Sequence, residues 1–343
     1  MTTIRQVADE AGVSIGTVSR VLNNKMGVGQ ETRRHVLDIA DQLGYSIPRR
    51  PEEEPQSVTH LGLLYNPFHA GLANPFYQDV FLGVEKACRG ENISLIFNSL
   101  DLPPNEGASL LNSFPPLLKD QNLSGLVLIG GDISENLVST LSKQFVKPII
   151  LVDNNFGNVM WDSVMIDNQQ GIRLIVEHLI ERGHRHIALM SGPDRPSIVE
   201  RRQGYETVLQ EVGLNSFIAQ PDNLGAVGAD ESVKKILDQA PQTTAIACSN
   251  DLQAVTTIRA LQRLNYKVPE DISVTGFDDT NMAALASPAL TTVHVDRLTL
   301  GCLGVENLLA RIKMPTKPIS KTVMGVHLIK RETVCKPRTH NVI

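Results

Sequence analysis

The sequence is poor in cysteine, and its four cysteines stand far apart with no C-x-x-C pair among them: Cys88, Cys248, Cys302 and Cys335. This spacing excludes a zinc cluster or a disulfide scaffold, and scattered single cysteines suit a reducing compartment. No stretch approaches the length of about 18 uncharged apolar residues that a membrane span needs. The N-terminus, MTTIRQVADEAG, lacks an apolar run behind a basic start, so no secretory signal is indicated. We therefore expect a cytoplasmic protein without contact to a membrane.

The sequence also lacks the motifs of common enzyme classes. It contains no G-x-S-x-G, P-loop, H-E-x-x-H or G-x-G-x-x-G pattern, and we predict a protein that is not an enzyme and needs no cofactor or metal. Its net charge of −5 argues against a chain that coats nucleic acid along its whole length. A local basic patch on one domain stays compatible with that charge.

Residues 1–45 carry the pattern of three short helices. The first has apolar residues at i, i+3, i+4 and i+7, a Thr3–Gln6 capping box and Gly12 at its end. Ser14 can then cap a second helix, and a third helix follows. The apolar residues expected to pack between them are Ile4, Val7, Ala8, Ala11, Val18, Val21, Leu22, Val36, Ile39, Ala40 and Leu43. Two helices joined by a tight turn are typical of a DNA-reading helix-turn-helix.

From residue 61 to about residue 330, short apolar runs alternate with helical patterns such as Asp167–Arg182 and Ser197–Val212. The runs predicted as buried strands are His60–Asn66, Ile93–Asn98, Gly125–Gly130, Pro148–Asp153, His186–Ser191, Thr244–Ser249 and Ile272–Phe277. Such alternation predicts a doubly wound α/β fold with parallel sheets. The number of strands favours two sheets, with a ligand cleft where their strand ends meet.

The segment Ile4–Asn23 reads IRQVADEAGVSIGTVSRVLN, which resembles the V-A-x-x-A-G-V-S-x-x-T-V-S-R-V-L-N pattern of the LacI/GalR family of bacterial transcription regulators. Family-like stretches continue to the end of the core, among them NPFYQDVFLGVEKAC from Asn74, HLIERGHRHIALMSGP from His178 and ISVTGFDD from Ile272. The resemblance implies an all-α helix-turn-helix headpiece followed by a two-subdomain, doubly wound α/β core that resembles periplasmic sugar-binding proteins. It further implies a homodimer that binds double-stranded, palindromic operator DNA. A small effector would rotate the two subdomains and thereby change the affinity of the dimer for the operator.

This resemblance assigns a domain to each part of the chain. The headpiece is expected at 1–45, a hinge at 46–60, the core at 61–330 and a tail at 331–343. The N-subdomain would comprise about 61–160 and 292–320, and the C-subdomain about 161–291 and 321–330. The three crossings between them are expected near 158–163, 288–294 and 318–324.

The resemblance places DNA-reading residues in and around the second helix. The two residues after V-S, which vary with the operator in the family, are Ile15 and Gly16. Ile15 offers only an apolar contact, for example to a thymine methyl, and Gly16 lets the backbone approach closely. Arg20 is the expected hydrogen-bonding reader of bases. Phosphate contacts or packing within the motif are expected of the remaining members of the set: Thr3, Ser14, Thr17, Ser19 and Asn23.

The hinge departs from the family pattern. Members carry a hinge helix whose leucine inserts into the minor groove, whereas this segment reads IPRRPEEEPQSV and has no leucine. Three prolines oppose a helix and three glutamates repel phosphates. We expect a solvated linker without minor-groove insertion, and phosphate contacts by Arg49 and Arg50 stay open as an alternative.

The effector residues are expected at strand ends. Asp153, Arg201, Asn250 and Asp278 stand at polar effector positions of the family, and Arg195, Asn74 and Phe76 are further candidates. Carboxylates that accept from vicinal hydroxyls and an arginine that donates suit a polyhydroxy ligand, so a carbohydrate is the expected effector. The family's stacking aromatic is absent near Gly228, where PDNLGAVG places Asn223 or Leu224, which counts against a simple hexose. A strand-end aspartate can also be a helix cap, and Asp251 and Asp279 fit that role better.

Besides the enzyme considered above, two rival interpretations arise. A sugar-transport binding protein is disfavoured by the missing secretory signal and the attached helix-turn-helix. A regulator that has lost DNA binding is kept open by the unusual hinge. A repressor is expected, although the sequence leaves activation possible. It leaves undecided the effector's identity and sign, the operator sequence and the target genes.

Overall fold

The computed structural model describes residues 2–22, 27–45, 58–71, 74–101, 113–157, 160–221 and 229–338. It divides into two compact units, residues 1–57 and residues 58–343, which are described one at a time. The predicted DNA contact Asn23, most of the predicted hinge and the segment around Asn223 and Leu224 lie outside the described residues.

The described residues of the first unit form three helices: α1 (Ile4–Glu10), α2 (Ile15–Leu22) and α3 (Gln30–Gln42). The capping box forms as predicted, because the Thr3 hydroxyl accepts from the backbone N–H of Gln6 and the Gln6 side chain accepts from that of Thr3. Gly12 takes a φ of 63°, the left-handed conformation that ends α1 at low steric cost. The helices enclose a small core whose buried members are Val7, Ala8, Ala11, Val18, Val21, Val36 and Ala40.

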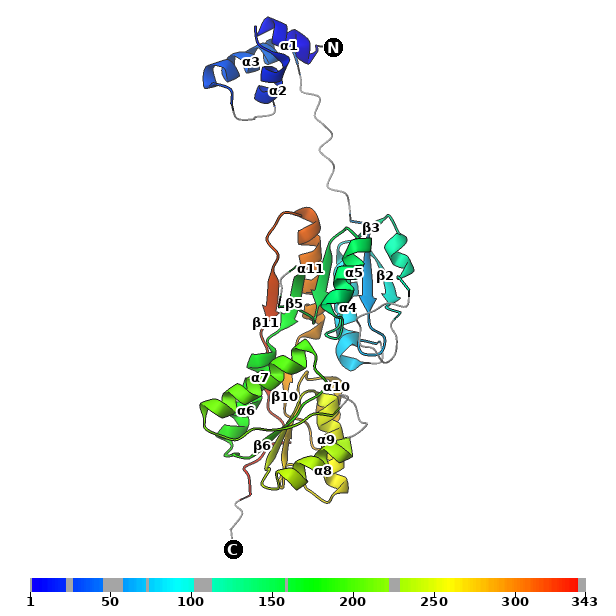
Figure 1. The fold of residues 1–343 in the computed structure, drawn as a ribbon, viewed down its shortest axis with the longest axis vertical. Coiled ribbons are helices and arrows are strands. Elements are labelled where there is room, and N and C mark those ends of the chain that lie inside the picture. Colours follow the sequence, from blue (N-terminus) through cyan, green and yellow to red (C-terminus); the bar gives the residue numbers. More distant parts are fainter. Residues whose placement is uncertain are drawn as a thin grey trace. The chain divides into compact units, whose positions relative to one another are not determined.

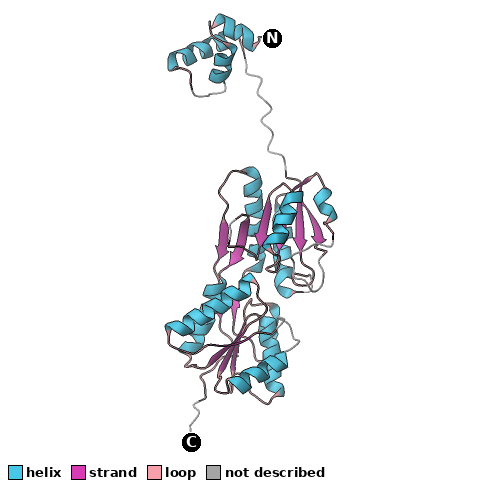
Figure 2. Cartoon of the chain, in the orientation of Figure 1, coloured by secondary structure: helices cyan, strands magenta, loops and turns pink. Residues whose placement is uncertain are grey.

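The second unit contains two α/β lobes (Figures 1 and 2). The larger sheet has the order β11-β5-β4-β3-β1-β2, and all its strands are parallel. The strands of this larger lobe are β1 (His60–Tyr65), β2 (Ser94–Ser99), β3 (Leu123–Ile129), β4 (Ile149–Val152), β5 (Asp162–Ile166) and β11 (Lys321–Met324). Its helices are α4 (Pro75–Gly90), η1 (Pro116–Lys119), α5 (Glu135–Gln144) and α11 (Arg297–Lys313).

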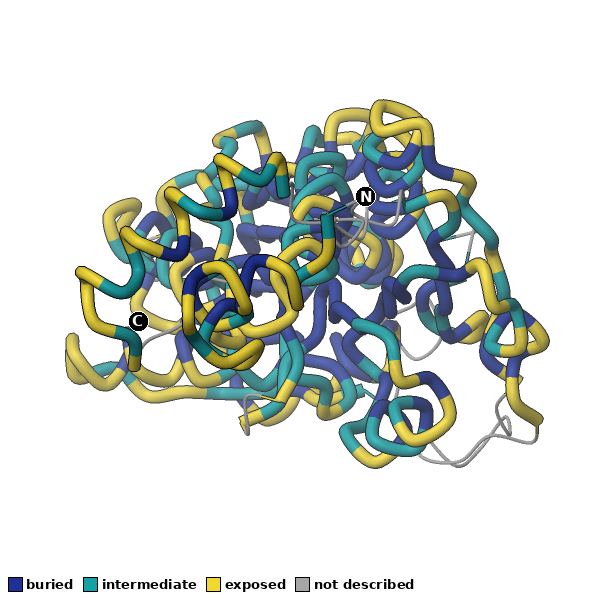
Figure 3. The backbone as a smooth tube through the Cα atoms, turned by 90° about the horizontal axis from the view of Figure 1, so that it is seen from above, coloured by how far each residue is buried: buried dark blue, intermediate teal, exposed yellow. Residues whose placement is uncertain are grey.

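Alternate residues of the central strands serve two separate cores, one on each face of this sheet. Leu61 and Leu63 of β1 pack in the cluster that includes residues of α4 and α11, whereas Leu64 belongs to the cluster with α5 and η1. Figure 3 colours the backbone by burial, with many buried segments toward the interior and exposed turns at the periphery. Burial of both faces explains why these strands read as continuous apolar runs in the sequence.

The smaller lobe is built on a parallel sheet of order β7-β6-β8-β9. Its strands are β6 (Ile187–Met190), β7 (Phe217–Ala219), β8 (Ala245–Cys248) and β9 (Ser273–Thr275). Its helices are α6 (Asn168–Glu181), α7 (Pro196–Glu211), α8 (Ala229–Gln239), α9 (Asp251–Arg263) and α10 (Asn281–Leu285). An antiparallel pair, β10 (Thr292–His294) with β12 (His327–Ile329), lies where the chain passes between the lobes. The predicted fold class is therefore confirmed.

Three predicted subdomain boundaries need correction, and Thr292–His294 of β10, expected in the N-subdomain, precede the crossing into the larger lobe. Residues 161 and 321 were expected to open segments of the C-subdomain, yet β5 and β11 are hydrogen-bonded to the larger sheet. The chain thus changes lobe after Ile166, between His294 and Arg297, and after Met324. The pattern hid β5 because it begins with two polar residues, and Asp162 is buried through an ion pair with Arg311 of α11, Oδ2 to Nε, at 2.7 Å.

Candidate effector cleft and DNA-reading helix

A polar pocket lies between the two lobes and has an empty volume of about 410 Å³, which includes space open to solvent. All seven predicted effector residues line it: Asn74, Phe76, Asp153, Arg195, Arg201, Asn250 and Asp278. The structure thus brings together side chains from both lobes that the sequence assigned to one site. That they hold an effector stays a prediction at this point.

Helix starts and strand ends position these side chains. Asn74 caps α4 and Asn250 caps α9, each accepting from a backbone N–H of its helix. Asp153 follows β4 with a φ of 57°, and Asp278 follows β9 with a φ of 106°. Such left-handed conformations are unfavourable for residues with a Cβ and are found mainly where the surrounding structure enforces them, often at functional sites.

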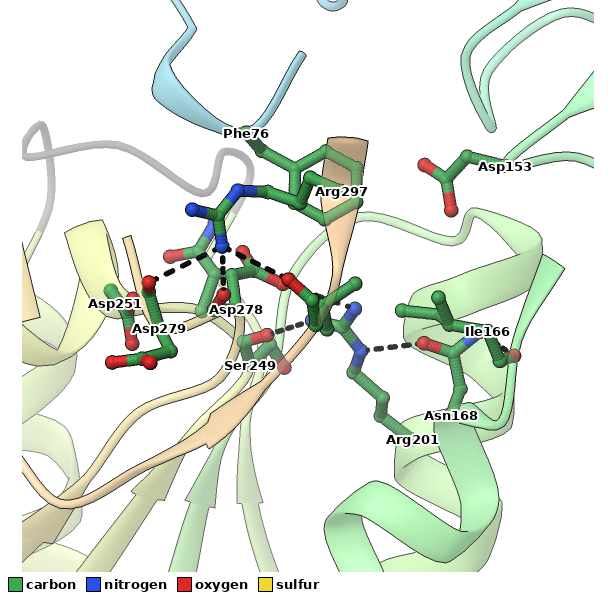
Figure 4. A network of polar contacts seen from close by, with 12 residues as sticks. Phe76, Asp153, Ile166, Asn168, Arg201, Ser249, Asp251, Asp278, Asp279 and Arg297 are labelled. Carbon is green, nitrogen blue, oxygen red and sulfur yellow. Dashed lines mark hydrogen bonds and ion pairs between the residues drawn. The ribbon is translucent and has the colours of Figure 1, made fainter. Parts of the chain in front are cut away.

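Arg201 is the centre of the smaller lobe's side of the pocket (Figure 4). It is almost fully buried, and its Nε donates to Oδ1 of Asn168 over 2.9 Å. Its Nη1 donates to the carbonyl oxygen of Ser249, and its Nη2 lies 3.4 Å from Oδ1 of Asp278. The guanidinium carbon stacks 3.6 Å above the ring centre of Phe277. A guanidinium fixed on three sides is pre-organised to donate to a ligand without losing side-chain entropy.

The larger lobe contributes an acceptor that lacks a full set of partners. Oδ2 of Asp153 accepts from the Tyr77 hydroxyl over 2.7 Å, whereas buried Oδ1 has no hydrogen-bond partner among the described residues. Burial raises the pKa of Asp153 to about 6, and the hydrogen bond from Tyr77 opposes that shift. A buried acceptor of this kind is costly unless a ligand donates to it.

A contact between His69 and Arg195 joins the lobes across the pocket. Nη1 of Arg195, just before α7, lies 3.0 Å from Nε2 of His69, which follows β1. Burial, assisted by the Arg195 charge, lowers the pKa of His69 to about 3, so the imidazole is neutral at physiological pH. The Tyr77 hydroxyl lies 3.2 Å from the same Nε2, so one polar chain runs from Arg195 to Asp153.

Asp278 differs from its acidic neighbours in its contacts, since burial raises the pKa of Asp251 as well. Burial raises the pKa of Asp278, and the Arg201 guanidinium opposes the shift. Asp251 instead accepts from Thr280 and Thr292, and Asp279 is paired with Arg331 and His294. Their contacts within the fold agree with a structural role for both, but neither residue is the side-chain cap that the sequence suggested: Asn250 caps α9, and no side-chain cap bond precedes α10.

Sequence reasoning missed four residues of the pocket lining: His69, Tyr77, Ser197 and Ile198. Ser197 and Ile198 follow Arg195 directly, so the start of α7 was a signal that could have identified them. His69 and Tyr77 flank the predicted Asn74 and Phe76. Nothing in their local pattern reveals their partners Arg195 and Asp153, which lie far away in the sequence.

In the headpiece, α2 presents the predicted DNA-reading residues. The Ser14 hydroxyl accepts from the backbone N–H of Thr17 over 3.1 Å and lies 2.9 Å from the Thr17 hydroxyl, so Ser14 is the cap of α2. Gly16 and Arg20 are exposed and four residues apart, which places them on one face of the helix. Ile15, at the first position of α2, is 42% exposed. Thr3 caps α1, and Ser19 is half-buried.

The comparisons with known proteins agree with both units. Residues 3–47 match the model of the lacI family of bacterial regulatory proteins, and residues 176–334 match a periplasmic binding protein-like domain. The transcriptional repressor PurR of Aliivibrio fischeri is 31% identical over 320 residues, which cover 91% of this chain and 92% of that protein. The ribose operon repressor of Haemophilus influenzae is 30% identical, covering 97% of this chain and 99% of that protein. A solved structure of the regulator CelR in complex with cellobiose superposes with a TM-score of 0.69 at 27% identity, covering 97% of this chain and all of that one.

The chain belongs to the LacI family of bacterial regulatory proteins. It is a ligand-responsive, DNA-binding transcriptional repressor, as the sequence predicted. Its relatives are regulators by name. Among the described residues, no helix is both long and apolar enough to cross a membrane.

Proposed function

We propose that this repressor acts in the cytoplasm as a homodimer on a palindromic operator and is controlled by a small polyhydroxy effector. The effector is a sugar or sugar derivative held by Asp153, Arg201, Asn250 and Asp278. The repressor works by binding alone, without catalysis. The observation that carries the proposal is the convergence of these four polar side chains from two lobes on one small pocket.

The chemistry of the pocket favours hydroxyl groups. Asp153 offers on one wall an acceptor that no described residue partners, and Arg201 offers a fixed donor on the other. A polyol carries donors and acceptors on adjacent carbons, so it can satisfy both walls at once. Phe76, which lines the same pocket, provides an apolar surface for the C–H face of a sugar ring. A relative named a ribose operon repressor is in keeping with this class.

Calorimetric titration of the full chain with D-ribose, D-xylose, D-glucose and cellobiose tests the effector class. We expect at least one sugar to bind wild type, and binding to be lost in Asp153→Asn. Asp194→Asn is the matched control, because Asp194 is exposed and pairs with Arg202 outside the pocket lining. Binding of adenine, guanine or hypoxanthine with no response to any of the sugars would overturn the sugar class.

Selection of bound duplexes from a random pool tests the operator. We expect a palindrome to be enriched at near-physiological salt, where non-specific binding is weak. Enrichment of a single half-site, together with a monomeric mass in solution, would contradict the dimer.

A further inference from the structure

Arg297 is the first residue of α11, directly after the chain crosses from the smaller to the larger lobe, and its side chain holds parts of both. Its Nε and Nη2 donate to Oδ2 of Asp79 on α4, over 3.0 and 2.8 Å. Its Nη1 donates to the carbonyl oxygen of Asp278 and lies 3.2 Å from that of Asp279 (Figure 4). Only 9% of the residue is exposed. One buried guanidinium therefore connects a helix of the larger lobe to a loop of the smaller lobe.

The larger-lobe end of this connection is stiff. A Cβ built on Gly83 of α4 would lie 2.0 Å from the carbonyl oxygen of Leu298, and one on Gly301 of α11 would lie 2.1 Å from that of Val80. The two helix backbones thus touch directly at the first turns of α11. Because close-packed elements transmit displacements instead of absorbing them, α4 and Arg297 should move together.

The smaller-lobe end of the connection is the loop that carries Asp278. The Asp278 side chain lines the pocket and contacts Arg201, while its carbonyl oxygen accepts from Arg297. Its backbone N–H donates to Val293, and its φ of 106° lies in the left-handed region. Side chain and carbonyl belong to one residue, so a displacement of the side chain at the pocket can reach the carbonyl that Arg297 holds.

We propose that Arg297 is the positioning residue that couples the Asp278 loop to α4, and so transmits the state of the pocket to the larger lobe. Arg297 is not among the residues that line the pocket, and it contacts the pocket residue Asp278 and the α4 residue Asp79 directly. The inference rests on the proposed function in one respect, the assignment of Asp278 as an effector contact. It predicts a coupling that can be measured without any effector.

The test uses Asp278→Asn as the perturbation of the pocket and hydrogen exchange in α4 as the readout, on the full chain. In an otherwise wild-type chain, Asp278→Asn should change the exchange rates of amides in the first two turns of α4 by about fivefold, the low end for coupled sites. In an Arg297→Gln background, the same substitution should leave α4 unchanged. Asp79→Asn should remove the coupling in the same way, and its half-exposed position keeps the test available if Arg297→Gln does not fold.

Arg311→Gln is the matched control on the same helix. Arg311 is also ion-paired, but its partners Asp162, Pro315, Lys317 and Pro318 all lie in the larger lobe. The response of α4 to Asp278→Asn should survive in this background. The proposal is overturned if α4 does not respond to Asp278→Asn in wild type, if the response persists without Arg297, or if Arg311→Gln abolishes it equally. Because no effector is used, these outcomes are independent of whether a sugar is the natural ligand.

Discussion

The hydroxyl of Tyr77 and the carboxylate of Asp153 form a buried hydrogen bond of 2.7 Å between α4 and the end of β4. This bond occupies one carboxylate oxygen and leaves the other without a partner among the described residues. This hydrogen bond does not fully replace the hydration that the carboxylate loses on burial, because the pKa of Asp153 is still raised to about 6. The carboxyl group is therefore held in the fold at a cost that depends on pH.

Asp153→Asn should flatten the pH dependence of stability. The folded state of wild type binds a proton at Asp153 more tightly than the unfolded state does, because the pKa is raised on folding. The resulting stabilisation is complete at a pH below the ordinary carboxyl pKa, and it is lost as the pH rises through about 6. The unfolding free energy of wild type should therefore fall relative to that of Asp153→Asn between about pH 4 and pH 6, by on the order of 3 kcal/mol. Urea denaturation across this range measures the difference, and parallel curves for the two proteins would contradict it.

Replacing Arg201 should cost far more than replacing the residue beside it. Arg201→Ala removes a buried guanidinium from Asn168, Ser249 and Asp278, and breaking such a buried pair costs about 3–5 kcal/mol. Arg202→Ala is the control, because Arg202 pairs with exposed Asp194 and should cost less than about 1 kcal/mol. Equal shifts of the urea midpoint in the two variants would show that the buried network around Arg201 does not stabilise the smaller lobe.

The sequence located residues of this pocket because they follow a rule of parallel sheets. Buried strands leave continuous apolar runs and ligand residues follow their carboxyl ends, so the pattern placed Asp153 and Asp278 at strand ends. The family resemblance then assigned both to the effector, which stays a prediction. Arg297 could not be placed, because its partner Asp79 is 218 residues away and no local signature links them. The same reason explains why β5, which begins with polar residues, was not predicted. Asp162 can be buried there because it pairs with Arg311, which is distant in sequence.

The contact between α4 and α11 should tolerate no side chain at its centre. Gly83→Ala would place a methyl group 2.0 Å from the carbonyl oxygen of Leu298, forcing the helices apart. We expect a loss of about 1–3 kcal/mol or more, as for other overpacked sites. Gly90→Ala, at the end of the same helix, meets no atom of the described residues within 4 Å and should be neutral or stabilising. Thermal unfolding of the two variants compares them, and equal melting temperatures would show that the helices can separate freely.

Arg20 should discriminate between DNA sequences, whereas a phosphate contact would not. Arg20 is exposed on the same face of α2 as Gly16, so it can reach base edges in the major groove. Arg20→Ala should weaken binding to the selected operator by about 1–3 kcal/mol more than binding to random DNA. Arg5→Ala, which removes an equal charge from α1, should weaken both alike. An equal loss on both DNAs for Arg20→Ala would reassign Arg20 to the backbone.

Ile15 should read the operator through a methyl group. Its side chain has no polar atom, yet it is 42% exposed at the start of α2, where a recognition helix enters the major groove. Removing one buried methyl contact costs about 0.8 kcal/mol, or roughly fourfold in affinity. Replacing thymine by uracil at one operator position at a time should therefore weaken wild-type binding at one position per half-site by this factor. The same replacement should have no effect on Ile15→Ala, because both changes delete the same contact. If uracil weakens binding equally in Ile15→Ala, the methyl is read by another residue or through DNA shape, and Ile15 is exposed for a different reason.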